Sequence, residues 1–209
     1  MINKIITKEE QSKLTPEMVL SDLMEGNKRY IKDDSHERDY NAQKTMAVTG
    51  QSPKAIVLSC VDSRVPVETV FDQGLGDVFV ARVAGNFANS DIIGSMEFAC
   101  GIAGSKLIFV LGHESCGAIS AACDQVKFGT MTAMLDNIQP AIEAIGDIKG
   151  EQSSKNKDYV QSVVMKNVEL TIDKIRKNSP VLEKLEDSGV IKIVGGVYYL
   201  KSGEIKLID

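Results

Sequence analysis

Two short polar motifs, each placed directly after an apolar run, constrain most strongly what this chain can form. The first motif, Cys-Val-Asp-Ser-Arg, starts at Cys60 and follows the run 55–58, while the second, Gly-His-Glu-Ser-Cys-Gly, spans 112–117 and follows 107–111. Short apolar runs of this kind are typical of buried strands. In an open parallel sheet, the carboxyl ends of neighbouring strands meet at one edge, where sites form. The sequence therefore predicts that the two motifs lie together.

Three side chains of these motifs form a candidate metal-ligand set. Cys60, His113 and Cys116 offer two thiolates and one imidazole, which suit zinc. A pair of cysteines alone is often part of a hydrophobic core. Here His113 and Cys116 have the spacing of metal ligands at a strand end, and Cys60 follows another strand, so the pattern favours metal binding over packing. Three protein ligands leave one position for water, as in catalytic zinc sites. We predict one zinc ion per chain.

The first motif also contains a carboxylate and a guanidinium two residues apart, Asp62 and Arg64. If the segment is extended, both side chains project to the same side and can pair. The arginine would hold the carboxylate ionised and leave a lone pair for a water on the metal. Released from Arg64, Asp62 could instead become the fourth zinc ligand. The alternative interpretation is an ordinary local salt bridge.

Composition limits the class of protein. A chain of 209 residues with 43% hydrophobic and 25% charged residues fits a single soluble domain, and its net charge of −5 argues against nucleic-acid binding. We find no apolar run of membrane-spanning length and no signal-peptide pattern, which predicts a cytoplasmic protein without a membrane partner. Cys100 and Cys123 lie in helical apolar patterns, so we expect packed free thiols rather than disulfides.

Alternating strand and helix signals continue along the chain. The expected strands cover 54–59, 78–83, 106–112, 190–199 and, after a hairpin turn, 205–208. The first expected helix starts at Thr15. Further helices are expected over 41–50, 67–71, 91–103, 118–125, 131–148 (as one or two helices), 158–177 and 180–189.

This alternation predicts an α/β fold with a mainly parallel central sheet flanked by helices and an antiparallel C-terminal hairpin. We expect a single domain, 1–209, with an N-terminal helical arm (1–48), a zinc-site core (50–125) and C-terminal helices and edge strands (126–209). The amphipathic helix that starts at Thr15 must cover its apolar side on the main body or on a partner chain.

With these motifs the chain resembles the β-class carbonic anhydrases. The resemblance rests on Cys-x-Asp-Ser-Arg-Val-Pro at 60–66 and Gly-His-x-x-Cys-Gly at 112–117, supported by Phe-Val-x-Arg-x-Ala-Gly-Asn at 79–86 and Gly-Ser-x-Glu at 94–97. It is dense from about Gly50 to Ala122 and loose at both ends.

The resemblance implies reversible hydration of carbon dioxide to bicarbonate and a proton by attack of a zinc-bound hydroxide. In this reaction Asp62 and Arg64 would be the family's dyad, with Asp62 orienting the hydroxide and taking part in proton removal. Cys60, His113 and Cys116 would be the zinc ligands, and Gly117 would belong to the substrate site.

Within the family, the chain is similar to the plant-like, open-site arrangement. Gln51 lies nine residues before Cys60, and Phe79 lies nineteen after it; Phe98 replaces a tyrosine of that group. Val57 stands where bicarbonate-regulated members carry tryptophan, so we expect no regulatory bicarbonate pocket.

The resemblance further implies a homodimer or a dimer of dimers in which the N-terminal helices pack on the partner chain. Gln51, Phe79 and Phe98 would then reach the zinc of the neighbouring subunit.

Two alternative functions stay open. One is hydrolysis of carbon disulfide or carbonyl sulfide on the same scaffold; the other is a non-catalytic member that keeps zinc, against which the presence of both Asp62 and Arg64 argues.

Overall fold

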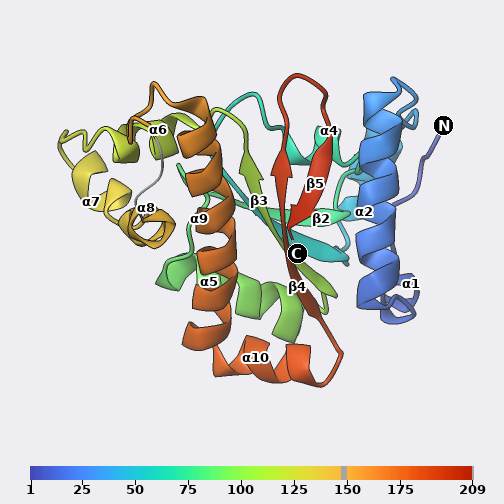
Figure 1. Ribbon diagram of the computed structural model, residues 1–209. Coiled ribbons are helices and arrows are strands. Elements are labelled where there is room, and N and C mark those ends of the chain that lie inside the picture. Colours follow the sequence, from blue (N-terminus) through green and yellow to red (C-terminus); the bar gives the residue numbers. More distant parts are fainter. Residues whose placement is uncertain (147–149, 209) are drawn as a thin grey trace.

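The computed structural model, which describes residues 1–146 and 150–208, contains a five-stranded sheet between two layers of helices (Figure 1). Its strand order is β2-β1-β3-β4-β5. The first four strands are parallel and β5 is antiparallel to β4, which confirms the predicted α/β class. The strands are β1 (Ala55–Ser59), β2 (Val78–Arg82), β3 (Leu107–His113), β4 (Lys192–Tyr198) and β5 (Ile205–Ile208).

Burial explains why these segments are strands. Every residue of β1 and of β3 is buried, as expected of central parallel strands covered on both faces. The edge strand β2 is only partly buried. Successive side chains of β1 and β3 point to opposite faces, so each strand supplies apolar residues to two separate cores.

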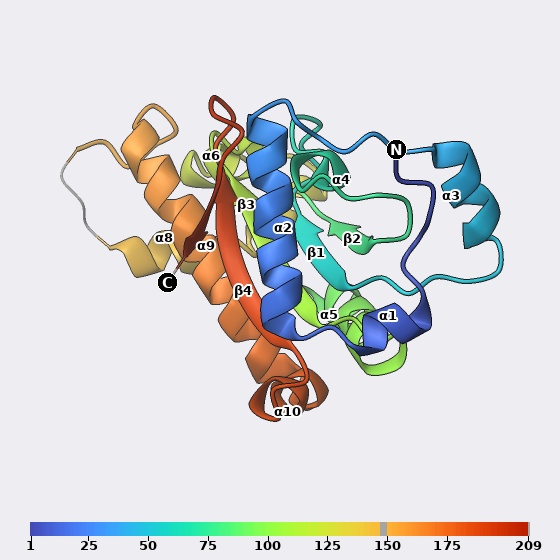
Figure 2. The ribbon, with the colours of Figure 1, turned by 90° about the vertical axis from the view of Figure 1, so that its right-hand side faces the viewer.

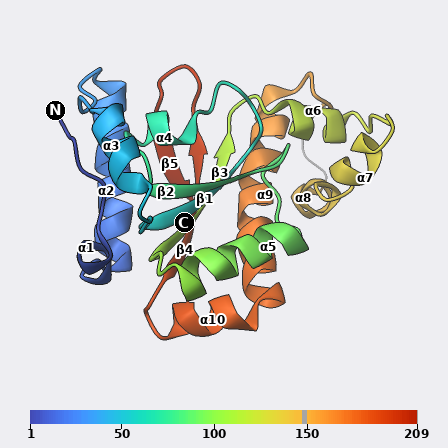
Figure 3. The same cartoon turned by 180° about the vertical axis from the view of Figure 1, so that it is seen from behind.

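One face of the sheet carries the helices that follow β2 and the C-terminal helices (Figure 3). These are α5 (Ser90–Glu97), the π-helical segment η1 (Phe98–Ile102), α9 (Lys157–Asn178) and α10 (Pro180–Asp187). The helix α9 approaches β3 closely where Gly112 lacks a side chain, since a Cβ there would lie 2.8 Å from Cγ2 of Val168. Close packing of α9 on β3 thus requires glycine at position 112.

The other face is covered by α2 (Pro16–Ile31) and α4 (Val67–Val70) (Figure 2). The predicted helix start is confirmed, because the side chain of Thr15 caps α2 and Pro16 occupies its first turn. Val19 and Leu23 are buried against the sheet of the same chain. The apolar side of this helix is therefore used within its own chain, and only its outer side remains for a partner.

The segment before α2 differs from the sequence-based expectation. Residues 1–14 lack apolar periodicity, yet Lys8–Ser12 form α1, which begins with a capping box between Thr7 and Glu10. Its buried side chain is polar: Nε2 of Gln11 donates to the carbonyls of Pro53 and Ala103. Hydrogen bonds to distant backbone groups, rather than an apolar face, hold this helix on the body.

The remaining helices follow the predicted positions. They are α3 (Tyr40–Ala47), α6 (Gly117–Cys123), α7 (Met131–Leu135) and α8 (Gln139–Ile145). The end of the helix predicted over 131–148 lies partly outside the described residues. None of the helices within 1–146 and 150–208 combines the length and the apolar character needed to cross a membrane.

The contact between α2 and the turn after α4 depends on Gly26, because a Cβ at this position would overlap the backbone carbonyl of Phe71. We predict that Gly26→Ala lowers the free energy of unfolding by about 3 kcal/mol, since the helix must move away from the sheet. Ser21→Ala, on the exposed side of the same helix, should change it by less than about 0.5 kcal/mol. Urea unfolding of both variants measures the difference; equal midpoints would contradict this account of the packing.

Candidate metal centre

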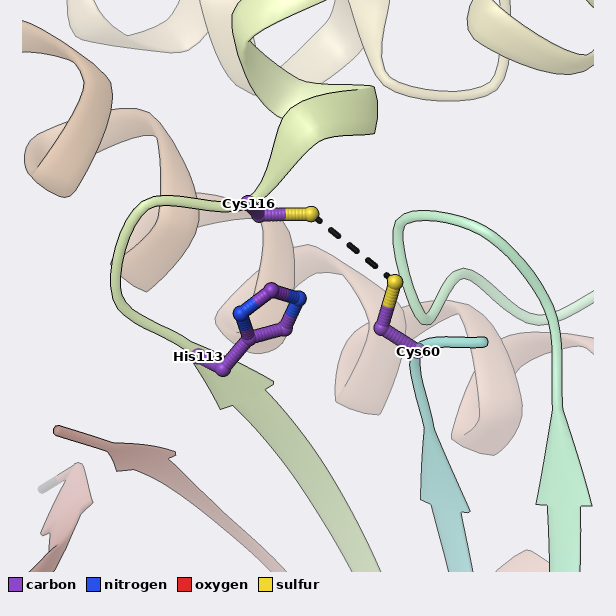
Figure 4. A group of neighbouring side chains, drawn as sticks. All are labelled: Cys60, His113 and Cys116. Carbon is purple, nitrogen blue, oxygen red and sulfur yellow. Dashed lines mark hydrogen bonds between the residues drawn. The ribbon is translucent and has the colours of Figure 1, made fainter. Parts of the chain in front are cut away.

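The three candidate ligands converge at the carboxyl edge of the sheet (Figure 4). Cys60 directly follows β1, His113 is the last residue of the neighbouring strand β3, and Cys116 is the N-cap residue of α6. Their ligand atoms all lie within 4.8 Å of one another, and the two sulfurs are 3.9 Å apart. Both cysteines are free and buried. The structure thus brings together the side chains that the two motifs place at neighbouring strand ends.

The imidazole of His113 is held in one orientation. Its Nδ1 lies 3.0 Å from the backbone carbonyl oxygen of Glu114, so Nδ1 carries the proton and donates it. Nε2 is buried and has no hydrogen-bond partner within the described part of the chain. Buried nitrogen atoms are normally paired. An unprotonated Nε2 beside two sulfurs is the arrangement expected of a metal ligand whose outer nitrogen is fixed by a backbone carbonyl.

The two thiols share an environment that favours one negative charge. The hydrogen bond with Cys116, together with the adjacent imidazole of His113, lowers the pKa of Cys60 well below its usual range despite its burial. The backbone N–H of Gly85 adds a hydrogen bond to Sγ of Cys60 at 3.3 Å. The same sulfur–sulfur contact, together with burial, raises the pKa of Cys116. The two sulfurs, 3.9 Å apart, are placed where a soft cation would bind both thiolates.

Asp62 and Arg64 form a two-point ion pair beside this cluster. Nε of Arg64 donates to Oδ1 of Asp62 at 2.9 Å, and Nη2 donates to Oδ2 at 2.7 Å. The guanidinium of Arg64 lowers the pKa of Asp62 to about 2, so the carboxylate stays ionised at neutral pH. Oδ2 lies 3.9 Å from Nε2 of His113. The carboxylate is thus next to the ligand cluster but is held by the arginine.

The backbone between Asp62 and Arg64 forms a turn and is not extended. The backbone N–H of Arg64 also donates to Oδ1 of Asp62, and the N–H of Val65 donates to the carbonyl of Asp62. These contacts define a tight turn in which the carboxylate accepts from the backbone two residues ahead. Asp62 and Arg64 therefore pair as predicted, but through a local turn rather than through the extended segment on which the argument was conditional.

Sequence reasoning assigned no role to two residues that support the site. Arg82, at the end of β2, donates from Nε to the carbonyl of Cys60 at 2.8 Å and from Nη2 to the carbonyl of Asp62 at 2.6 Å. Glu114 accepts from His113 through its backbone and from the Leu200 N–H through its side chain. Arg82 could have been found by applying the strand-end argument to β2, since it lies level with Ser59.

The expected substrate-site residues are dispersed within one chain. Only Gly117 adjoins the cluster, as the first residue of α6. Phe79 is level with Ile56 of β1, about 13 Å along the strand from Cys60. The rings of Phe79 and Phe98 contact each other at 6.1 Å between centroids and line a surface hollow between β2 and α5. Gln51 is exposed and precedes the amino end of β1.

The described part of the chain is an α/β sheet with a cluster of three candidate ligands, Cys60, His113 and Cys116, at its carboxyl edge. A set of three protein ligands is typical of catalytic zinc centres. Comparison with known proteins makes this class specific. A family model described as carbonic anhydrase matches residues 55–205. Carbonic anhydrase 2 of Mycobacterium tuberculosis is 32% identical over 193 residues, which cover 90% of each protein.

Solved structures agree with this match. One of the two tetrameric β-carbonic anhydrases of Sordaria macrospora superposes with a TM-score of 0.68 at 26% identity, covering 79% of this chain and 85% of that one. The β-carbonic anhydrase CafA of Aspergillus fumigatus has the same fold, with a TM-score of 0.72 at 24% identity and 91% of each chain covered. The chain belongs to the β-class carbonic anhydrase family, and its enzyme class is accordingly that of the carbonic anhydrases.

Two buried cysteines near α6 allow a matched test of the metal centre. We predict that Cys116→Ser reduces the bound metal from about one ion per chain to nearly none, since two ligands cannot hold it tightly. Cys123→Ser, which changes a buried thiol outside the cluster, should retain the metal. Elemental analysis after dialysis measures both. Metal retained by Cys116→Ser, or lost equally from the two variants, would show that the cluster is not the binding site.

Proposed function

We propose that this protein catalyses the reversible hydration of carbon dioxide to bicarbonate and a proton, with one zinc ion held by Cys60, His113 and Cys116. The observation that carries the proposal is the convergence of these three ligands in a chain of the β-class family. Zinc, when bound, supplies a Lewis acid that activates a water molecule at neutral pH. The free thiols must stay reduced for this role, as in a cytoplasmic location.

Asp62 is proposed to orient the attacking water. Oδ1 already accepts from both the backbone and Nε of Arg64, whereas Oδ2 accepts only from Nη2 among the described residues and lies 3.9 Å from Nε2 of His113. Oδ2 therefore retains a lone pair that can accept a hydrogen bond, and then a proton, from a water beside the cluster. The side chain of Asp62 is 15% exposed, so a proton accepted there can pass to solvent or buffer.

Arg64 is proposed to keep the fourth metal position free. Its two contacts fix the carboxylate plane and favour the ionised form. Without the arginine, Asp62 could turn toward the cluster, since Oδ2 is only 3.9 Å from Nε2 of His113. The carboxylate would then become the fourth ligand and block the site. The open arrangement thus depends on an ion pair whose arginine side chain is 53% exposed.

The proposed role of Asp62 can be separated from metal binding. We predict that Asp62→Asn retains zinc but lowers the carbon dioxide hydration rate by about 10²–10⁴-fold, since an amide cannot accept the proton. Asp187→Asn, an exposed carboxylate at the end of α10, serves as the control and should keep the full rate. Stopped-flow measurement with a pH indicator gives both rates.

An unchanged rate in Asp62→Asn would disprove the role given to this carboxylate. A different outcome bears on the substrate: if the unmodified protein hydrates carbon dioxide no faster than buffer but releases sulfide from carbonyl sulfide, the reaction has been assigned to the wrong triatomic molecule.

We further propose a homodimer or a dimer of dimers in which neighbouring chains complete the substrate site. Gln51, Phe79 and Phe98 lie apart from the cluster of their own chain, and the Phe98 side chain is 53% exposed. In the sheet formed by residues 1–146 and 150–208, the strand β2 that carries Phe79 lies at the edge. The Sordaria macrospora relatives are tetrameric, which supports assembly. Substrate contacts would then come from Gln51 and the two phenylalanines of the neighbouring copy.

Subunit complementation tests this arrangement. We predict that Gln51→Ala lowers the hydration rate by about tenfold or more and that Cys60→Ser abolishes it. Co-expressed Gln51→Ala and Cys60→Ser chains should recover about a quarter of the centres, because half of randomly formed dimers are mixed and one centre in each is intact. Co-expressed Asp62→Asn and Cys60→Ser chains are the control and should not recover. Equal behaviour of the two mixtures would place Gln51 at its own centre or at none.

A further inference from the structure

A buried polar side chain interrupts the apolar face of α9. Asn167 is 3% exposed and lies among Val163, Val164 and Val168, which are buried in the cores on that side of the sheet. A buried amide is costly unless it is hydrogen-bonded. Nδ2 of Asn167 donates to the backbone carbonyl of Gly85 at 2.8 Å. This contact joins the C-terminal helix to the turn that follows β2.

The same glycine contacts the metal cluster through its other backbone group. The N–H of Gly85 donates to Sγ of Cys60 at 3.3 Å. Gly85 has a φ of 84°, which favours glycine, and a Cβ there would lie 2.7 Å from Cδ1 of Ile138. The N–H and the carbonyl of Gly85 belong to adjoining peptide planes that meet at its Cα. The hydrogen bond from Asn167 holds the second plane and, through the shared Cα, limits the movement of the first, whose N–H donates to Cys60.

We propose that Asn167 is a positioning residue for the ligand Cys60, acting through the backbone of Gly85. The N–H of Gly85 fixes the sulfur at one position and withdraws charge from the thiolate. Such outer contacts typically change metal affinity by about 10- to 100-fold. The inference rests on the proposed zinc site, but not on the reaction that the site catalyses.

The location of the hydrogen bond between Asn167 and Gly85 also supports a role at the sulfur of Cys60. Arg82 already holds the backbone of Cys60 through the carbonyl, so the main chain before the ligand is fixed without Asn167. What Arg82 does not contact is the sulfur, whose backbone N–H donor is Gly85. The hydrogen bond from Asn167 is therefore placed to act on the ligand atom rather than on the strand end.

The variants for this test can be matched on one helix. Asn167→Leu removes the donor with little change of shape, and Asn167→Ser shortens the side chain so that it no longer reaches Gly85. Thr171→Val is the control, because Thr171 lies one turn further on α9, is equally buried at 3% and borders the same hollow between α8 and α9. This hollow also gives the leucine room, so we expect all three variants to fold.

Two readouts on the full-length protein report on the sulfur. Competition with a chelator gives the zinc dissociation constant, which should rise by about tenfold in both Asn167 variants and by less than twofold in Thr171→Val. In the cobalt(II)-substituted protein, the thiolate-to-cobalt charge-transfer band should shift in the Asn167 variants only. A purely structural role would lower the unfolding midpoint of the variants but leave the band of the folded protein unchanged.

Unchanged zinc affinity and an unchanged cobalt band in both Asn167 variants would overturn the proposal. If those variants failed to fold, the unmodified protein would still provide a test of the proposal. With an NMR-active cadmium isotope bound, the amide proton of Gly85 should show scalar coupling to the metal across its N–H···S contact with Cys60. Absence of that coupling would also overturn it. A protein that binds zinc in this way but does not hydrate carbon dioxide would refute the proposed function alone.

Discussion

The parallel pairing of β1 with β3 is the interaction on which the candidate metal centre depends. It brings together residues that are 56 positions apart, Cys60 and Cys116, because the strands are in register up to Ser59 and Leu111. The pairing is stabilised by apolar side chains that are buried on both faces of the sheet. Each such side chain contributes about 1.5–3 kcal/mol when it leaves water. Apolar burial therefore supplies the free energy that holds two thiols and an imidazole in one small volume.

Charge balance explains how so buried a cluster can exist at the sheet edge. Two thiolates and a neutral imidazole around a divalent cation carry no net charge, and the adjacent pair of Asp62 and Arg64 is also neutral. Burial of unpaired charge costs several kcal/mol for each ion, so neutrality within each unit keeps this cost small. Without the cation, the hydrogen bond between the sulfurs and the one from the Gly85 N–H to Cys60 provide the compensation. The proposed zinc thus satisfies the electrostatics of the site as well as its geometry.

Much of the fold could be predicted because its signals are local. The cap at Thr15 and the apolar runs of β1 and β3 identify elements from their own residues. The turn at Asp62 could not be predicted from side-chain spacing, since the carboxylate bonds to backbone N–H groups that any residue would offer. The helix α1 was missed for a similar reason: Gln11 is held by carbonyls from residues far along the chain.

The candidate site shows the same division. The ligands themselves were evident from residue types and strand ends, whereas the contacts of Arg82 and Asn167 depend on which loop lies beside which helix. Asparagine within the apolar face of α9 was a visible signal that a buried acceptor must be near. Its partner, a glycine carbonyl after β2, was not visible, because every residue carries a carbonyl.

The placement of β4 and α9 has a consequence for how the protein is made. All three ligands have been synthesised once residue 116 is in place, whereas Asn167 follows on α9, and β4, which pairs with the open edge of β3, is synthesised after α9. A nascent chain therefore carries these thiols without the neighbouring strand β4 while residues 117–198 are synthesised. If zinc binds as proposed, its final coordination environment is complete only after β4 has paired with β3.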